Sequence, residues 1–351
     1  MTMRALLMVG KDQLEMADIA TPERPASWAL VRVRASALGL FHQQMAAGMI
    51  DTKGLPRILG HEIVGEIVEA DSPATPPPGS LVVADAVVGC GVCEWCVRGS
   101  ESICPWMTHL GIDLDGGFAD YAVVPESNLF LLSPDTPLDE AVMLSSALPA
   151  AVHGMRRSGI AAGSRMVISG VGSIGFTVCQ VARAMGATSI VAADVAADHL
   201  AAVEPWVDAT VDVSGMSPAE SSEALKAALG APHGADLTFE ASGHPSSVDT
   251  VLRAARPGGT VVLMGIVHGS ATLHFDDFLF DCIKRELNII ATFGFTRADF
   301  LLGNALYESG ALDLRPLIGP TVALEGVPEA LAAIAAGGTG GKRQVVDVAI
   351  A

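Results

Sequence analysis

A glycine-rich turn between a short apolar strand and a helix constrains the fold of this 351-residue chain more than any other feature. The turn consists of Gly170, Val171, Gly172, Ser173, Ile174 and Gly175. In a G-x-G-x-x-G turn the first glycine permits a tight bend, the second lets the backbone approach a pyrophosphate, and the third lets the helix pack closely on the strand. The helix N-terminus also offers unpaired N–H groups to phosphates. The segment therefore predicts a dinucleotide site, and the alternative is a glycine-rich turn in an ordinary strand–helix–strand unit.

Asp194 ends the next predicted strand, 19 residues after Gly175. A carboxylate at this place accepts hydrogen bonds from the hydroxyls of the adenosine ribose, and it repels the 2′-phosphate of NADP. No arginine or lysine lies between Asp194 and His199 to compensate that charge. The sequence therefore predicts NAD(H) as the cofactor.

The chain around this turn alternates between predicted strands and helices. Strands are predicted at 165–169, 189–193, 235–240 and 260–265, and helices at 175–186, 198–203 and 246–255. This alternation predicts an α/β domain with a doubly wound parallel sheet. The first 150 residues instead show the alternating polarity of strands, for example at 29–35 and 62–70, and predict a barrel-like β domain.

Four of the six cysteines fall within fifteen residues. They are Cys90, Cys93, Cys96 and Cys104. Gaps of two residues let successive thiolates turn onto one ion, and four sulfur ligands leave no open coordination position. The spacing therefore predicts one structural Zn²⁺ per chain, and oxidised disulfides are the alternative.

The formal net charge of −18 limits the partners of the chain. Binding to nucleic acid needs a cationic surface, and an anionic membrane surface would repel this chain. We find no targeting segment and expect a cytoplasmic protein. The expected partners are a small-molecule substrate and further copies of the same chain.

Several motifs occur together in the order that is typical of one family. They are Gly60-His61-Glu62, the four cysteines, the segment 115–121 (DGGFADY), the glycine-rich turn, the segment 239–243 (FEASG) and the segment 256–259 (RPGG). On these motifs the chain resembles the zinc-containing medium-chain dehydrogenases, which include alcohol, sorbitol and threonine dehydrogenases. The resemblance covers nearly the whole length of the chain.

The resemblance implies a chaperonin-like β-barrel catalytic domain at residues 1–150, with the structural zinc lobe at about 88–106. It implies a Rossmann NAD-binding domain at 151–290 and a return to the catalytic domain at 291–351. An active site between the two domains and a homodimer or homotetramer are further implications. Lys342 and Arg343 are expected to contact the pyrophosphate.

The same resemblance implies a catalytic zinc with three protein ligands, which polarises the substrate oxygen. His61 matches one of these ligands. Phe41, or Gly39 in a shifted alignment, occupies the place of a cysteine, and Ser146 occupies the place of a cysteine or glutamate. One imidazole does not hold zinc tightly, so we expect the catalytic zinc to be absent.

The remaining polar residues at this place are His61, His42 and Glu62. His42 or His61 is a candidate proton donor to the substrate, and Glu62 is expected to orient its surroundings. A zinc site rebuilt from these three residues is an alternative, and so is a histidine that faces solvent. We expect hydride transfer between NAD(H) and a carbonyl or alcohol, or an activated C=C or C=N bond. A zinc alcohol dehydrogenase with substitute ligands and a non-enzymatic NAD-binding protein are the alternatives.

Overall fold

The computed structural model describes residues 2–266, 272–337 and 341–350. The chain divides into two units, which are residues 1–146 with 317–351, and residues 147–316. Among the described residues, no helix has both the length and the apolar character that crossing a membrane requires.

Unit 1 contains most of the antiparallel strands. Its strands are β1 (Thr2–Gly10), β2 (Gln13–Ala20), β3 (Trp28–Leu38), β4 (Arg57–Ile58), β5 (Ile63–Glu69), β6 (Leu81–Ala84), β7 (Val87–Val88), β8 (Thr108–His109), β9 (Tyr121–Pro125), β10 (Leu129–Leu131), β17 (Ile318–Ala323) and β18 (Arg343–Asp347). Its helices are α1 (Leu40–Ala46), α2 (Glu94–Val97), α3 (Leu138–Leu144) and α10 (Val327–Ala335).

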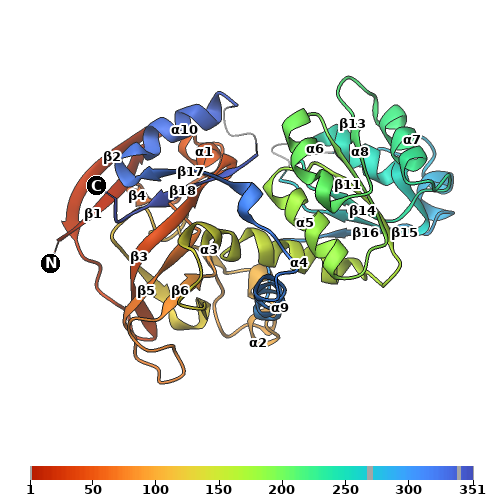
Figure 1. Cartoon of the computed structure of the whole chain (residues 1–351). Coiled ribbons are helices and arrows are strands. Elements are labelled where there is room, and N and C mark those ends of the chain that lie inside the picture. The colour runs from red at the N-terminus through yellow and green to blue at the C-terminus, as the bar shows by residue number, and fades with distance from the viewer. Residues whose placement is uncertain (1, 267–271, 338–340, 351) are drawn as a thin grey trace. The chain divides into compact units, whose positions relative to one another are not determined.

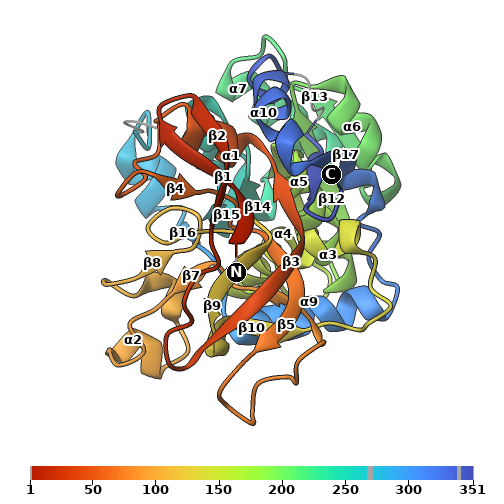
Figure 2. The same ribbon diagram turned by 90° about the vertical axis from the view of Figure 1, so that its left-hand side faces the viewer.

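The main sheet of unit 1 has the order β10-β6-β5-β3-β18-β17, and β9 also pairs with β3. The 11-residue strand β3 is therefore the organising strand, because it pairs with β5, β9 and β18. Figure 2 shows the long strand β3 with β5 beside it. Apolar side chains alternate along β3 and point into one buried core. The pairing of β18 with β3 places residues 344–347 beside residues 35–38.

Unit 2 is built on a six-stranded parallel sheet with the order β13-β12-β11-β14-β15-β16. The strands are β11 (Arg165–Ser169), β12 (Ser189–Asp194), β13 (Ala209–Asp212), β14 (Ala235–Glu240), β15 (Ala255–Leu263) and β16 (Asn288–Ala291). The helices are α4 (Ala147–Ser158), α5 (Ser173–Ala184), α6 (Ala197–Val203), α7 (Pro218–Ala228), α8 (Pro245–Ala254) and α9 (Arg297–Glu308). Helices α4 and α5 pack against each other, as do α7 and α8, and together they cover the sheet (Figure 1).

The end of unit 2 differs from the boundary expected near residue 290. Residues 291–316 belong to unit 2, and the chain returns to unit 1 only at Leu317. Helix α9 packs against α4, and the buried Asp299 on α9 accepts hydrogen bonds from His153 and Arg156 on α4. Packing between helices that lie far apart in sequence thus decides this boundary.

Candidate functional site

The glycine-rich turn joins β11 to α5 in unit 2. Gly170 has a φ of +87°, which favours glycine, and a Cβ there would lie 2.5 Å from the Ser242 nitrogen. A Cβ on Gly175 would lie 1.8 Å from the Gly170 carbonyl oxygen, whereas one on Gly172 would meet nothing within 4 Å. Two of the glycines are therefore required by the turn itself. Gly172 leaves open space at the N-terminus of α5, where the unpaired N–H groups of the first turn can bind phosphate.

Asp194 lies at the carboxyl end of β12 beside this turn. Its Oδ2 accepts hydrogen bonds from the Val171 nitrogen (2.8 Å) and from Nδ1 of His199 (3.1 Å). Its Oδ1 accepts from the nitrogens of Val195 (2.8 Å) and Ala196 (3.0 Å). Burial raises the pKa of Asp194, but these hydrogen bonds outweigh burial and hold the pKa below its ordinary value. The carboxylate is therefore charged and fixed in place.

The four cysteines in unit 1 come together as the spacing predicts. The Sγ atoms of Cys93 and Cys96 lie 3.5 Å apart, those of Cys93 and Cys104 3.7 Å, and those of Cys90 and Cys96 4.0 Å. Four ligands at Zn–S distances of about 2.3 Å in a tetrahedron have sulfur–sulfur distances of about 3.8 Å. A disulfide would need about 2.05 Å. The donor set therefore fits a structural zinc and not disulfides.

The loop that carries His61 is held by the segment that carries the DGGF motif. The nitrogens of Gly117 and Phe118 donate to the carbonyls of Gly60 and Leu59, at 2.7 and 3.0 Å. A Cβ on Gly116 would lie 2.3 Å from the Gly60 oxygen, so the two loops approach too closely for a side chain. Two motifs that are far apart in sequence thus fix the position of His61.

His42 on α1 stacks on His61, with ring centroids 4.4 Å apart and planes 20° apart. The Phe41 ring stands edge-on to His61 at 5.0 Å, and His109 at the end of β8 does so at 5.5 Å. The structure therefore brings the two predicted histidines into one cluster. It also places Phe41 as an apolar wall of that cluster.

Several polar atoms of this cluster are buried without a partner in the described part of the chain. They are both ring nitrogens of His42, Nδ1 of His61 and Oε1 of Glu62. Burial, with a smaller effect of Arg343, lowers the pKa of His42 to about 3. Burial also lowers the pKa of His61 well below its ordinary value, with a smaller effect of His42. Both imidazoles are therefore neutral at pH 7, and a buried polar group without a partner is costly unless a ligand satisfies it.

Glu62 is fully buried and pairs with Arg343, whose Nη1 lies 3.2 Å from Oε2. Burial raises the pKa of Glu62, while Arg343 and a hydrogen bond with Ser146 act in the opposite direction. The Arg343 side chain also packs against Gly39, where a Cβ would lie 2.8 Å from Nη1. Arg343, expected as a pyrophosphate contact, thus directs its guanidinium at Glu62.

The cluster also has the composition of a metal site. One ligand atom each from His42, His61 and Glu62 lie within 4.8 Å of one another. Two neutral imidazoles and one carboxylate are a known zinc donor set, and the atoms without a partner belong to these residues. The Phe41 ring contacts His61 edge-on, and Ser146 acts on Glu62 by lowering the pKa of its carboxyl. The residues present therefore fit a metal ion through a rearranged donor set.

One member of this cluster was not predicted from the sequence. His109 directly precedes the turn at Leu110 and Gly111 and lies beside His61. Its Nδ1 lies 2.8 Å from the Leu110 carbonyl oxygen, which identifies Nδ1 as the protonated nitrogen. Arg343 was assigned a different contact. Neither position carries a local signal, because both depend on the pairing of distant strands.

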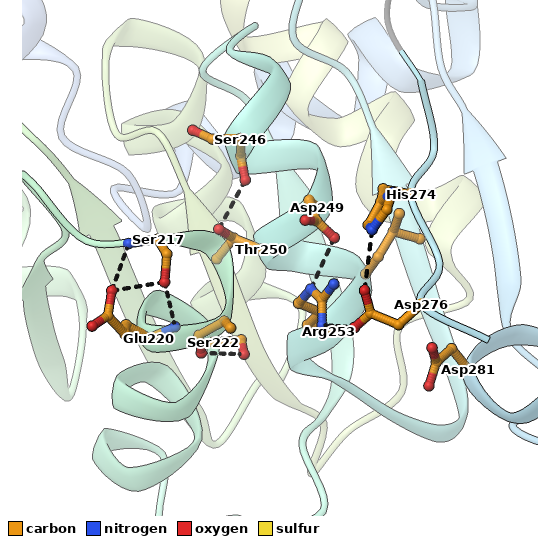
Figure 3. Close-up of polar contacts among 12 residues, drawn as sticks. Ser217, Glu220, Ser222, Ser246, Asp249, Thr250, Arg253, His274, Asp276 and Asp281 are labelled. Atoms are coloured by element: carbon orange, nitrogen blue, oxygen red, sulfur yellow. Dashed lines mark hydrogen bonds and ion pairs between the residues drawn. The ribbon is translucent and has the colours of Figure 1, made fainter. Parts of the chain in front are cut away.

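A concavity of about 400 Å³ in unit 2 is lined by residues of α7 and α8 and of the segment 274–285 (Figure 3). Its charged groups satisfy one another, since Arg253 pairs with Asp249 at 3.0 Å and with Asp276 at 2.9 Å, and His274 pairs with Asp276 at 3.1 Å. None of its lining side chains is among the buried unpaired atoms of the described residues. The cluster around His61 and the glycine-rich turn are therefore the stronger candidate sites.

Comparison with protein families supports this choice. Residues 25–134 match the alcohol dehydrogenase GroES-like domain, and residues 173–306 match the zinc-binding dehydrogenase family. D-xylulose reductase A of Aspergillus oryzae is 30% identical over 80% of this chain and 78% of its own length. L-idonate 5-dehydrogenase (NAD(P)(+)) of Escherichia coli is 30% identical over 83% of this chain and 82% of its own length.

The fold is similar to that of solved structures. A Sinorhizobium meliloti protein described as a zinc-binding dehydrogenase, bound to NADP, superposes with a TM-score of 0.90. It is 28% identical in sequence, and the match covers 99% of both chains. A GroES-like domain joined to a Rossmann-like domain is therefore the architecture of this chain.

Proposed function

The chain belongs to the zinc-binding, medium-chain alcohol dehydrogenase family of oxidoreductases, and from this premise we propose that it transfers a hydride between NAD(H) and a small alcohol or the corresponding carbonyl compound. The observation that carries the proposal is the coexistence of an intact dinucleotide turn with a buried polar cluster around His61. The relatives named for xylulose and idonate support a polyhydroxy substrate. An activated C=C or C=N bond remains the alternative substrate class.

The cofactor, when bound, supplies or accepts the hydride. Gly172 leaves room for its pyrophosphate at the N-terminus of α5, and Asp194 accepts hydrogen bonds from the adenosine ribose. The charge of Asp194 supports NAD(H) over NADP(H), even though the Sinorhizobium meliloti protein binds NADP.

His42 and His61 would act on the substrate oxygen. Because their pKa values lie below the ordinary range, each imidazole is neutral at pH 7 and offers one N–H and one lone pair. During carbonyl reduction the N–H donates a hydrogen bond to the oxygen as negative charge develops there. Glu62 and Arg343 hold the loop of His61 and compensate each other's charge.

We propose further that the chain holds one structural zinc at its four cysteines and no catalytic zinc. Phe41 and Ser146 replace two family ligands, and the Arg343 guanidinium already supplies positive charge beside Glu62. The second candidate is a metal-dependent alcohol dehydrogenase in which His42, His61 and Glu62 hold a cation. The unpaired atoms of these residues favour that candidate. A cation there would polarise the substrate oxygen.

Turnover with purified protein tests the function. We expect NADH oxidation with ketoses or small ketones, or NAD⁺ reduction with the matching polyols, followed at the nicotinamide absorbance. Binding of NADH without turnover of carbonyls, alcohols, enones or imines would support a non-enzymatic NAD-binding protein and refute the proposal.

Metal analysis separates the two forms of the site. We expect about one zinc per chain, lost from a Cys104→Ser variant and kept in His61→Ala. About two metal ions per chain, of which His61→Ala loses one, would establish the second candidate. The matched control is Cys282→Ser, which keeps the wild-type metal content because Cys282 lies outside both clusters.

We also propose that the chain forms a homodimer or homotetramer. Strand β16 is an edge of the six-stranded sheet, and the residues just before it expose Phe278, Phe280 and Ile283. An open edge beside exposed apolar side chains favours pairing with a second copy. Light scattering should give two or four chains per particle, and a monomer in wild-type protein would refute this proposal. A cytoplasmic location stays a prediction.

A further inference from the structure

His109 at the end of β8 is the third imidazole of the cluster around His61, and the proposed function gives it no role. Its ring stands edge-on to His61, with centroids 5.5 Å apart and planes 62° apart. Its Nδ1 lies 2.8 Å from the Leu110 carbonyl oxygen. A carbonyl oxygen only accepts hydrogen bonds, so Nδ1 is the protonated nitrogen, and Nε2 of the neutral ring carries a lone pair.

The turn that carries His109 fixes the position of this ring. The His109 nitrogen donates to Oδ2 of Asp113 at 2.9 Å, and the His109 carbonyl oxygen accepts from the Asp113 nitrogen at 2.9 Å. A Cβ on Gly111 would lie 3.1 Å from the carbonyl carbon of Gly60, so the turn lies directly against the loop that carries His61. The protein therefore sets both the place and the tautomer of the His109 ring before a substrate binds.

The second ring nitrogen of His109 is left for a ligand. In the part of the chain that the structure describes, Nδ1 has a hydrogen-bond partner and Nε2 has none. Burial lowers the pKa of His109 below its ordinary value, so Nε2 is an acceptor and not a donor at neutral pH. An acceptor in a half-buried place favours a hydroxyl group of a ligand over a methyl group, which leaves the lone pair without a partner.

We propose that His109 is a specificity-determining residue, and that its Nε2 accepts a hydrogen bond from a substrate hydroxyl on the carbon next to the reacting one. This inference rests on the proposed function, in which His61 acts on the reacting oxygen. Because the two rings lie 5.5 Å apart, oxygens on neighbouring carbons of one small molecule can contact both. The substrate class is then an α-hydroxy ketone or the matching vicinal diol.

Two ketones that differ in one hydroxyl test the proposal. They are acetoin and 2-butanone, and kcat/KM of each is measured with NADH at about pH 8, where even an ordinary histidine is neutral. The hydroxyl of acetoin also activates its carbonyl, so the ratio of the two kcat/KM values is compared between proteins. His109→Phe keeps a planar ring without Nε2, and His109→Gln keeps a hydrogen-bond acceptor.

We expect the ratio of acetoin to 2-butanone to fall by about tenfold in His109→Phe, because acetoin loses a hydrogen bond that 2-butanone never makes. His109→Gln should keep the ratio within about threefold of wild type, since its amide oxygen can accept the same bond. His233→Phe, an exposed loop position in unit 2, should keep the wild-type ratio.

A further measurement needs no variant. The methyl ether of acetoin keeps the electronegative oxygen but has no hydroxyl to donate. Wild-type protein should reduce it with a kcat/KM about tenfold below that of acetoin. Equal values for acetoin and its methyl ether would refute the role of His109.

The failure of this inference differs from that of the proposed function. If wild-type protein oxidises NADH with neither ketone, the proposed function itself is wrong. If it reduces both, and His109→Phe lowers both kcat/KM values by the same factor, the proposed function stands and His109 only supports the structure of the cluster.

Discussion

The Arg343 guanidinium donates a hydrogen bond of 3.2 Å to the Glu62 carboxylate, across 281 residues of sequence. Arg343 begins β18, and Glu62 directly precedes β5; both of these strands pair with β3. Glu62 is fully buried and Arg343 nearly so. Arg343 therefore compensates the buried charge of Glu62, which lies in one cluster with His42 and His61.

Removing one partner of this pair should be strongly destabilising. We expect Arg343→Met to lower the free energy of unfolding by about 3 to 5 kcal/mol, because it leaves the Glu62 charge buried and unpaired. Arg98→Met, in an exposed pair with Glu94, should cost less than about 1 kcal/mol. Denaturant unfolding measures both. Adding Glu62→Gln to Arg343→Met should restore part of the loss, and strictly additive effects would contradict a direct interaction.

The histidine cluster should control turnover. We expect His61→Ala and His42→Ala each to lower kcat by about 10²- to 10⁴-fold, since each removes a group proposed to act on the substrate oxygen. Steady-state kinetics with the best substrate measures this effect. His244→Ala, an exposed helix cap in unit 2, is the control. An unchanged kcat in both cluster variants would rule out their proposed role.

Substitutions at two glycines of the dinucleotide turn should have different effects, one on stability and the other on NADH binding. Gly175→Ala places a Cβ 1.8 Å from the Gly170 carbonyl oxygen, so we expect a loss of about 3 kcal/mol in stability. Gly172→Ala meets no protein atom within 4 Å and should fold normally. It should nevertheless weaken NADH binding by at least about tenfold, because the methyl group occupies the approach to the pyrophosphate. Thermal unfolding and fluorescence titration of both variants check this contrast, and wild-type NADH affinity in Gly172→Ala would contradict it.

The four-cysteine lobe should depend on its metal. We expect Cys104→Ser to lose one zinc and to become sensitive to proteolysis within residues 88–106, because a bound ion would tie the four thiolates of this segment together. Limited proteolysis followed by mass spectrometry locates the cleavage. The matched variant Cys282→Ser should resist cleavage there. Equal resistance of a zinc-free Cys104→Ser protein would show that the lobe folds without metal.

Asp299 should contribute to stability in a defined pH range. Burial raises its pKa, but hydrogen bonds from His153 and Thr296 outweigh burial and lower it from 3.8 to about 2. A lowered carboxyl pKa stabilises the folded state above the unfolded value, and this stability is lost as the pH falls from about 4 to about 2. The shift corresponds to about 2 kcal/mol.

The measurement is the free energy of unfolding against pH for wild type and Asp299→Asn. The variant should be less stable near neutral pH, and its stability should fall less steeply between pH 4 and 2. Asp135→Asn, in an exposed loop, should keep the wild-type slope. If the free energy of unfolding changed with pH equally in wild type and Asp299→Asn, Asp299 would not be the source of this pH dependence.

The sequence by itself determined the parts of the protein that depend on local chain geometry. The spacing of the cysteines from Cys90 to Cys104 allows four thiolates to converge, and the structure confirms that they do. The glycine-rich turn and Asp194 follow from a single strand–turn–helix–strand unit, and the family and fold inferred from these motifs are confirmed by the comparisons. Such features need only neighbouring residues, so their patterns could be recognised in advance.

Only the tertiary structure decided which side chains share the buried cluster. The contacts of His61 with His42 and His109, and the pairing of Arg343 with Glu62, depend on the strand order around β3. The boundary at Leu317 likewise depends on the packing of α9 against α4. The physical reason is that burial and long-range packing set the partners and the charge of these groups. A local sequence pattern does not predict which distant residues contact one another in this cluster.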